Sequence, residues 1–175
     1  MMSKKTPIVG ILMGSDSDYD IMVEAAKVLK QFEIPFEMIV SSAHRTPERT
    51  MEYVRGARGK GIKVLIAGAG AAAHLAGVVA AETLLPVIAV PIDATSMRGL
   101  DALLAMVQMP AGIPVATMAI GLAGSRNAGI FAARMLATED LELEKKLLQF
   151  KQDMAAGVIK KSDLVQKKMA EDGLI

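Results

Sequence analysis

The chain contains no cysteine and no tryptophan, and its 175 residues include only two histidines. Without cysteine, the protein can form no disulfide bond, no thiolate nucleophile and no thiolate metal site. The lack of cysteine also agrees with a reducing compartment, so we expect a cytoplasmic protein. The two histidines, His44 and His74, both lie in polar or glycine-rich stretches that follow apolar runs.

An excess of charge of one sign is also missing. The chain carries 20 basic and 19 acidic residues, for a net charge of +1. This balance gives no support to a nucleic-acid-binding or anionic-membrane surface, so we predict neither a nucleic acid nor a membrane as partner. The N-terminal residues 1–7 are basic, but no signal-peptide cleavage pattern follows them.

One uncharged run, residues 64–81, approaches the ~18 residues that a membrane helix needs. The run consists mostly of alanine and glycine, contains His74 and is followed at once by Glu82. We therefore interpret it as a strand, a glycine turn and an alanine-rich helix. A helix over 71–81 would be apolar on nearly every side, and such a helix must be buried on most faces. We expect part of that burial to occur at a subunit interface.

Five short, nearly continuous apolar runs alternate with helical patterns, which is typical of parallel strands covered on both faces. The expected strands span 8–13, 36–40, 63–67, 87–90 and 115–120, and the expected helices span 18–32, 47–60, 72–82, 99–108 and 125–137. We predict an α/β three-layer sandwich with a five-stranded parallel sheet in the flavodoxin-like order 2-1-3-4-5. A C-terminal helical extension over about 140–170 should follow a core of about 7–138, all within a single domain, 1–175.

Two helix starts carry their own signals. Thr46 followed by Pro47 offers an N-cap and a proline at the first helical position. Ser15 or Ser17 can cap the first helix in the same way.

Polar residues follow the first three expected strands, and the predicted strand order brings those three strand ends together. Arg45, with nearby serines and helix N-termini, indicates a phosphate site. His44 is a candidate general acid or base, because the unperturbed histidine pKa of ~6.5 suits proton transfer near neutrality. We expect Asp18 at a helix start, where the helix dipole favours a carboxylate, and Asp16 as a solvated turn residue.

Two other interpretations of this region stay open. The two histidines and two aspartates lack local metal-ligand spacing, so we expect no metal. Residues 68–73 match the loose dinucleotide fingerprint G-x-G-x-x-A, with Asp93 further along the chain. This motif permits a nicotinamide enzyme or a non-catalytic nucleotide-binding module, although close helix–sheet packing explains the glycines equally well.

Four ordered motifs together resemble the N5-carboxyaminoimidazole ribonucleotide mutase family of purine biosynthesis. They are Met-Gly-Ser-Asp-Ser-Asp at 13–18, Ser-Ala-His-Arg-Thr-Pro at 42–47, Ala-Gly-Ala-Gly at 67–70 with Ala-His-Leu at 73–75, and Gly-Leu-Asp at 99–101 through Val-Gln-Met-Pro at 107–110. The resemblance covers roughly residues 8–136. It implies an isomerase that moves a carboxyl group from the exocyclic nitrogen of an aminoimidazole ribotide to ring carbon C-4, without metal or organic cofactor.

The resemblance also implies roles for individual residues. Ser15, Ser42 and Arg45 would bind the ribose phosphate, Asp18 the ribose hydroxyls, and His44 would be the catalytic acid and base. The segment from Gly70 to His74 would enclose the carboxylate or transient CO2. The full implied substrate-binding set is Gly14, Ser15, Ser17, Asp18, Ser42, Ala43, Arg45, Gly70, Ala71, His74 and Leu75.

A related branch of the family adds free CO2 directly to the ring, and it tends to have Ser-Ala-His-Lys and an Ala-Gly-Arg-Ser loop. Arg45 and the Ala-Gly-Ala at 69–71 favour the mutase branch, with direct carboxylation as the alternative. Ala71 stands where the family usually has glycine and Ala76 where it usually has proline, and residues 93–98 also depart from the common pattern. If the backbone at position 71 needs a positive φ, alanine would be strained there.

The resemblance finally implies an octamer with sites built at subunit contacts. It also implies a pathway partner, the ATP-dependent N5-carboxyaminoimidazole ribonucleotide synthetase that would supply the substrate.

Overall fold

The computed structural model describes residues 6–175. Residues 1–5, which the predicted single domain and the basic N-terminal segment both include, lie outside this range. The described chain divides into two compact units, one ending at Leu136 and the other beginning at Ala137. No helix among residues 6–175 combines the length and the apolar character that crossing a membrane requires.

A five-stranded parallel sheet in the order β2-β1-β3-β4-β5 forms the centre of the first unit, as predicted. Its strands are β1 (Val9–Met13), β2 (Phe36–Val40), β3 (Val64–Gly70), β4 (Val87–Ile92) and β5 (Ala116–Thr117). β1 and β4 are buried along their whole length, and β3 is buried except at its last residue. These uninterrupted apolar runs are what a strand covered on both faces requires.

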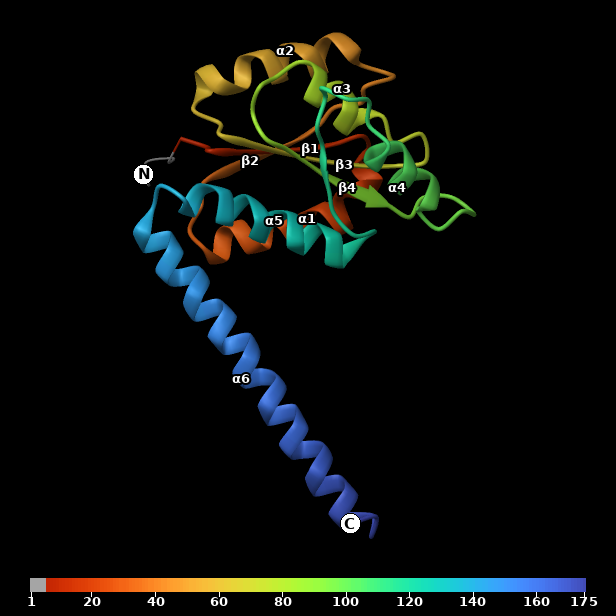
Figure 1. Cartoon of the computed structure of the whole chain (residues 1–175). Helices are drawn as coiled ribbons and strands as arrows, with labels where there is room; N and C mark the ends of the chain where they lie inside the picture. The colour runs from red at the N-terminus through yellow and green to blue at the C-terminus, as the bar shows by residue number, and fades with distance from the viewer. Residues whose placement is uncertain (1–5) are drawn as a thin grey trace. The chain divides into compact units, whose positions relative to one another are not determined.

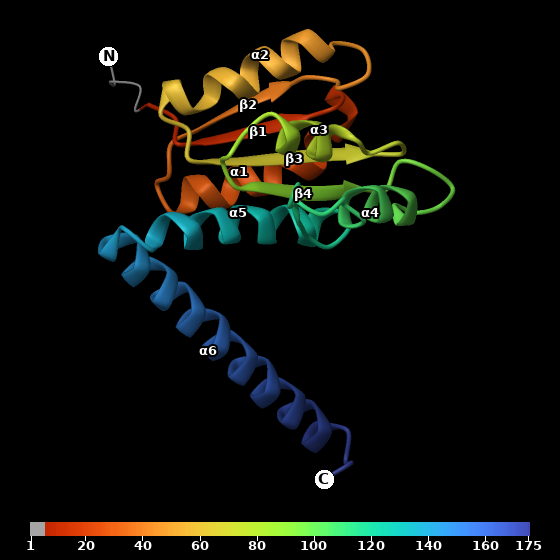
Figure 2. The same cartoon turned by 45° about the horizontal axis from the view of Figure 1, so that its top comes forward.

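Helices cover both faces of the sheet, which gives the predicted three layers (Figure 1; Figure 2). α1 and α5 lie on one face, and α2, α3 and α4 lie on the other, where α2–α4 share one hydrophobic core with β1, β3 and β4. The helices of this unit are α1 (Tyr19–Gln31), α2 (Pro47–Ala57), α3 (Leu75–Ala81), α4 (Leu100–Val107) and α5 (Leu122–Ala137), with single 3-10 turns η1 (Asp16–Asp18) and η2 (Arg58–Lys60).

The last strand is shorter than predicted. Instead of spanning 115–120, β5 is confined to Ala116–Thr117, paired with Ile88 and Ala89 of β4. Beyond these pairs, the backbone N–H of Gly121 still donates to the carbonyl of Pro91 (2.9 Å). Pro91 has no N–H to return, however, so the ladder cannot continue past it.

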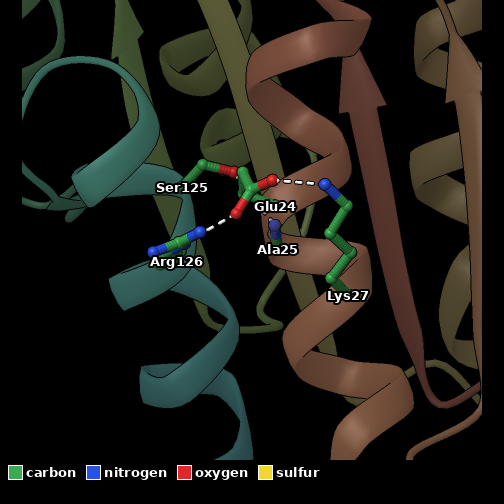
Figure 3. Close-up of polar contacts among 5 residues, drawn as sticks. All are labelled: Glu24, Ala25, Lys27, Ser125 and Arg126. Carbon is green, nitrogen blue, oxygen red and sulfur yellow. Dashed lines mark hydrogen bonds and ion pairs between the residues drawn. The ribbon is translucent and has the colours of Figure 1, made fainter.

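α1 and α5 are joined by polar contacts as well as by packing (Figure 3). The buried carboxylate of Glu24 accepts hydrogen bonds from Nζ of Lys27 and Nε of Arg126, both at 2.6 Å. The hydrogen bond from Lys27 and then that from Arg126 hold the pKa of Glu24 below its ordinary value. The buried hydroxyl of Ser125 accepts from the backbone N–H of Ala25 (3.1 Å).

The second unit consists mainly of α6 (Leu141–Glu171), a helix of 31 residues. Asp140 caps it through its side chain, which accepts from the backbone N–H groups of Glu142 (3.1 Å) and Leu143 (3.0 Å). This helix corresponds to the C-terminal extension expected over about 140–170. Its treatment as part of one domain with the core stays a prediction.

Candidate active site

A cavity of about 360 Å³ lies at the carboxyl ends of the first three strands of the sheet. All predicted site residues except His74 line this cavity. Its walls consist of Gly14, Ser15, Ser17, Asp18, Ser42, Ala43, His44, Arg45, Ala69, Gly70, Ala71, Ala72, Leu75 and Ala94. The position agrees with the general rule that ligands of open parallel sheets bind beyond the carboxyl ends of the strands, where the strand order reverses.

The turn after β1 is held by a reciprocal capping box. The hydroxyl of Ser15 accepts from the backbone N–H of Ser17 (3.3 Å), and the backbone N–H of Ser15 donates to Oδ2 of Asp18 (3.1 Å). Ser15 therefore caps η1, the turn that leads into α1, whereas α1 itself starts without a side-chain cap. Asp16 is exposed and closes the same turn by accepting from Ser17, as expected for a solvated turn residue.

Asp18 is the buried carboxyl of the site, with only 6% of its surface exposed. Burial raises its pKa above the ordinary value, while hydrogen bonds from the backbone of Ser15 and Gly14 oppose the shift. The backbone thus stabilises the charged form of a carboxylate that would otherwise be costly to bury.

The turn after β2 is organised differently from the prediction. Pro47 does occupy the first position of α2, but Thr46 makes no side-chain cap. Instead, the hydroxyl of Thr46 accepts from the backbone N–H of Ser42 (3.1 Å) and donates to the carbonyl of Ser42 (3.0 Å). A buried hydrogen bond between the hydroxyls of Ser41 and Thr50 (2.8 Å) joins the end of β2 to α2. Thr46 therefore fixes the loop rather than the helix terminus.

Arg45 connects the first two turns. Its Nη2 donates to the carbonyl of Gly14 (3.0 Å), and its Nε donates to the hydroxyl of Ser42 (3.4 Å). The same hydroxyl accepts from the backbone N–H of Arg45 (3.2 Å). These contacts hold an exposed guanidinium at the cavity wall next to Ser15 and Ser42, the arrangement that anion recognition needs.

The two histidines of the chain meet at the rim of the cavity. Nε2 of His44 lies 3.0 Å from Nδ1 of His74, and the rings are arranged edge to face. His44 lines the cavity, while His74 reaches it only through His44. Both rings are exposed.

The end of β3 differs from the predicted turn. β3 runs through Gly68 to Gly70, and α3 begins at Leu75 rather than at residue 72. Ala71 has φ 53°, so the predicted strain at this position is present. A residue with positive φ lies outside the right-handed helical region, so Ala71 belongs to the segment between β3 and α3.

These findings correct the dinucleotide interpretation of residues 68–73. Gly68 lies inside a buried strand, where a Cβ atom would overlap the side chain of Met22 on α1. A glycine at position 68 is therefore required for α1 to pack closely against the sheet. Gly70 is also needed for close approach, because a Cβ atom there would lie 2.5 Å from Cβ of Ala94. The strand–turn–helix arrangement that the fingerprint requires is not formed.

Two residues of the cavity wall lie outside the predicted site. Ala69 directly precedes the predicted segment from Gly70 to His74, which includes the wall residue Ala72, and Ala94 follows β4. The rule that collected the first three turns applies to the fourth strand as well, since β4 neighbours β3 in the sheet. That rule was a usable signal for Ala94, although its small apolar side chain gave no chemical signal. Across residues 6–175, no three acidic or histidine side chains come together as metal ligands.

Comparison with known proteins gives a consistent picture. The model of the AIR carboxylase family matches residues 8–157. The chain is 49% identical to N5-carboxyaminoimidazole ribonucleotide mutase from Pyrococcus horikoshii, covering 95% of this chain and 93% of that protein. It is 52% identical to the protein of the same name from Mycobacterium tuberculosis, covering 94% and 92%. The crystal structure of Treponema denticola PurE superposes with a TM-score of 0.82 at 29% identity, covering 90% of this chain and 97% of that one.

Proposed function

The chain belongs to the AIR carboxylase family, and from this premise we propose that it is a mutase, an isomerase of de novo purine biosynthesis. It interconverts N5-carboxyaminoimidazole ribonucleotide and 4-carboxyaminoimidazole ribonucleotide. Identity of about half over nearly the whole chain to proteins of that name supports the activity. The single observation that carries the proposal is His44 beside Arg45 in a cavity that also contains a buried carboxyl, Asp18.

In the proposed binding mode, the ribose phosphate contacts Arg45 and the hydroxyls of Ser15 and Ser42. Arg45 is anchored by two of its nitrogens, so its remaining donors face a ligand without further ordering. Asp18 binds the ribose hydroxyls. Binding at this end, remote from the reacting carbons, orients the imidazole ring.

The proposed reaction passes through aminoimidazole ribotide and CO2. The bond between the exocyclic nitrogen and the carboxyl carbon breaks, CO2 leaves, and the nitrogen receives a proton from His44. Ring carbon C-4 then attacks the CO2, and His44 removes the proton from C-4. One proton is given and one is taken back, so His44 ends each turnover in its starting state. Neither an oxidant nor a nucleophilic side chain is consumed.

The segment from Gly70 to His74 is proposed to enclose the carboxylate and the transient CO2. Small side chains, Ala69, Ala71 and Ala94, line this part of the cavity and suit an apolar gas molecule. Excluding water here retains CO2 near the ring until it reacts. Gly14, Ser17, Ala43 and Leu75 complete the proposed binding wall.

We propose further that the reaction uses no metal or organic cofactor. The substrate would come from the ATP-dependent N5-carboxyaminoimidazole ribonucleotide synthetase, as the family resemblance implies. A cytoplasmic location belongs with this proposal, because a phosphorylated ribotide stays in the compartment in which it is made.

We also propose a homo-oligomer, with the octamer of the family as its expected form. The sequence predicted an oligomer because a helix over 71–81 would be apolar on nearly every side. The helix that forms, α3, is shorter, and it buries Leu75, Ala76, Val79 and Ala80 within its own chain. Better support comes from α4, where Leu100, Leu104 and Val107 form an exposed apolar face at helical spacing. Light scattering at micromolar concentration tests this, and a stable monomer would overturn it.

The activity is tested by incubating the protein with 4-carboxyaminoimidazole ribonucleotide and following its conversion to the N5-carboxy isomer. Isomerisation without added bicarbonate supports the mutase. Product formed only from aminoimidazole ribotide and added CO2 would instead identify the direct carboxylase. The same assay with His44→Asn is the control for background decarboxylation in solution.

A further inference from the structure

A second cavity, of about 340 Å³, is also lined by Arg45 but not by His44. Its wall shares Gly14, Ser15, Ser42 and Arg45 with the first cavity, so the two are separated only by these residues. The residues that distinguish it are Asp16, Thr46 and Arg49, together with the end of β2. Arg45, the proposed phosphate-binding residue, thus lines two neighbouring cavities rather than one.

Arg49 is the cation that only this second cavity contains. It is the third residue of α2, one helical turn beyond Arg45, and its side chain is exposed. Arg55 on the same helix is paired with Glu82, whereas no described residue forms an ion pair or side-chain hydrogen bond with Arg49. Its guanidinium retains its full set of donors, next to the positive N-terminal end of α2.

The first cavity offers a phosphate a single guanidinium. Arg45 lines it together with the carboxyl of Asp18, while Asp16 lines only the second cavity. A phosphate monoester carries between one and two negative charges near neutrality. With Arg45 alone, one guanidinium would have to balance both the phosphate and the carboxyl of Asp18. With Arg49 included, the two arginines balance Asp16 and Asp18, and both guanidinium-bearing residues line the same cavity.

We propose that Arg49 forms the outer wall of the phosphate subsite, so that the phosphate of the ribotide lies between the guanidinium groups of Arg45 and Arg49. The identity of the ligand as this ribotide rests on the proposed function. The subsite itself would bind any ribose phosphate. Arg45, tied to Gly14 and Ser42, provides the fixed contact. Arg49, free of protein partners among the described residues, closes over the anion when it binds.

The test compares Arg49→Gln with Arg58→Gln. Both variants remove one exposed guanidinium from the same helical segment, but Arg58 lies on η2 and lines neither cavity. Binding of ribose 5-phosphate and of ribose to each protein is measured by calorimetry at fixed salt concentration. Loss of a charge-assisted contact should weaken ribose 5-phosphate by about tenfold to a hundredfold in Arg49→Gln. Ribose binding, and both ligands in Arg58→Gln, should be unchanged.

A third variant, Arg49→Lys, retains the charge without the planar fork, and it should lose less affinity than Arg49→Gln. Equal affinities for wild type and Arg49→Gln, or equal losses in Arg49→Gln and Arg58→Gln, would overturn the inference. Because ribose 5-phosphate lacks the imidazole, the outcome does not depend on catalysis. If the wild type binds ribose 5-phosphate through Arg49 but performs no isomerisation, the proposed function fails and the subsite stands.

Discussion

His44 and His74 form a direct ring-to-ring hydrogen bond, in which Nε2 of His44 lies 3.0 Å from Nδ1 of His74. One of the two nitrogens must donate and the other must accept, so a contact between neutral rings contains a single proton. The contact therefore holds the ring of the proposed catalytic histidine against the ring of its neighbour.

His44→Asn should abolish turnover while leaving substrate binding largely intact. Asparagine has a similar size and a hydrogen-bond donor, but it cannot exchange a proton near neutrality. General acid–base groups typically contribute about 100- to 10,000-fold, so the loss in kcat should be of that order. Steady-state kinetics, together with ligand binding measured by calorimetry, separates the two effects.

His74→Asn is the companion variant, and it should reduce turnover less than His44→Asn. In our interpretation His74 holds the ring of His44 and shapes the pocket but does not touch the substrate itself. Near-normal turnover in His44→Asn, combined with an inactive His74→Asn, would mean that the two roles are reversed.

Arg45→Ala should weaken binding of the ribotide much more than binding of its dephosphorylated nucleoside. The lost charge-assisted contact, ~1.5–3 kcal/mol, is felt only when the phosphate is present. Equal losses for the two ligands would show that Arg45 does not bind the phosphate. Arg58→Gln again provides a control for nonspecific charge effects.

Ala71→Gly should stabilise the protein. Ala71 has φ 53°, a conformation that costs a residue with a Cβ atom about 1–2 kcal/mol and costs glycine nothing sterically. The greater freedom of glycine in the unfolded chain offsets part of this gain, so we expect a net increase of about 0.5–1 kcal/mol in the free energy of unfolding. Ala72→Gly, at the neighbouring exposed residue without positive φ, should be destabilising instead. Urea unfolding at one protein concentration measures both.

Gly124→Ala and Gly56→Ala should have opposite effects. A Cβ atom at Gly124 in α5 would overlap the backbone carbonyl of Ala119, which cannot move away as a side chain can. We expect the free energy of unfolding of Gly124→Ala to fall by ~1–3 kcal/mol or more, as in other overpacked sites. Gly56 on α2 has nothing within 4 Å of the added atom, so alanine there should stabilise the helix by about 0.5–1 kcal/mol. Thermal unfolding of the two variants provides the comparison, and a tolerated Gly124→Ala would contradict it.

Glu24→Gln should lower the free energy of unfolding at neutral pH, and this loss should disappear in acid. The pKa of Glu24 lies below its ordinary value because Lys27 and Arg126 bind the carboxylate. A carboxyl group whose pKa is lower in the folded than in the unfolded state stabilises the folded protein at pH values above its unfolded-state pKa. That stabilisation disappears as the pH falls through the folded-state pKa. The difference in the free energy of unfolding between wild type and variant should therefore be constant near pH 7 and shrink as the pH falls below the ordinary pKa of 4.5.

Unfolding curves from pH 7 to pH 3 record this convergence. Glu142→Gln is the matched control, since Glu142 is an exposed partner of Lys145 and should show little dependence on pH. A gap between wild type and Glu24→Gln that is equally large at every pH would mean that Glu24 acts through packing and not through charge.

Strong local patterns made the sheet predictable from the sequence. β1, β3 and β4 are uninterrupted apolar runs, and the alternation with helices leaves few ways to order the strands. The ends of elements were less predictable, because they depend on single atoms. β5 stops where Pro91 of a neighbouring strand has no N–H, and Ala71, with φ 53°, lies in the segment before α3.

The rule that places ligands at strand ends gathered candidate residues from three separate turns, and the family resemblance added Gly14, Ala43, Ala71 and Leu75. The contacts between those residues could not be predicted from the sequence. The pairing of His44 with His74 depends on side-chain directions in two loops separated by 30 positions. Thr46 matched an N-cap pattern, yet its hydroxyl bonds back to Ser42, because the loop offers two backbone partners at the same place.

The hydroxyl contacts around the turn after β2 also determine how a ligand is received. Ser41 with Thr50, and Ser42 with Thr46, join both ends of this short loop to a strand and a helix. The conformational entropy of the loop is thus lost during folding and not during binding. Association should accordingly be fast and close to rigid-body, with the backbone amides of this loop already protected from hydrogen exchange in the free protein.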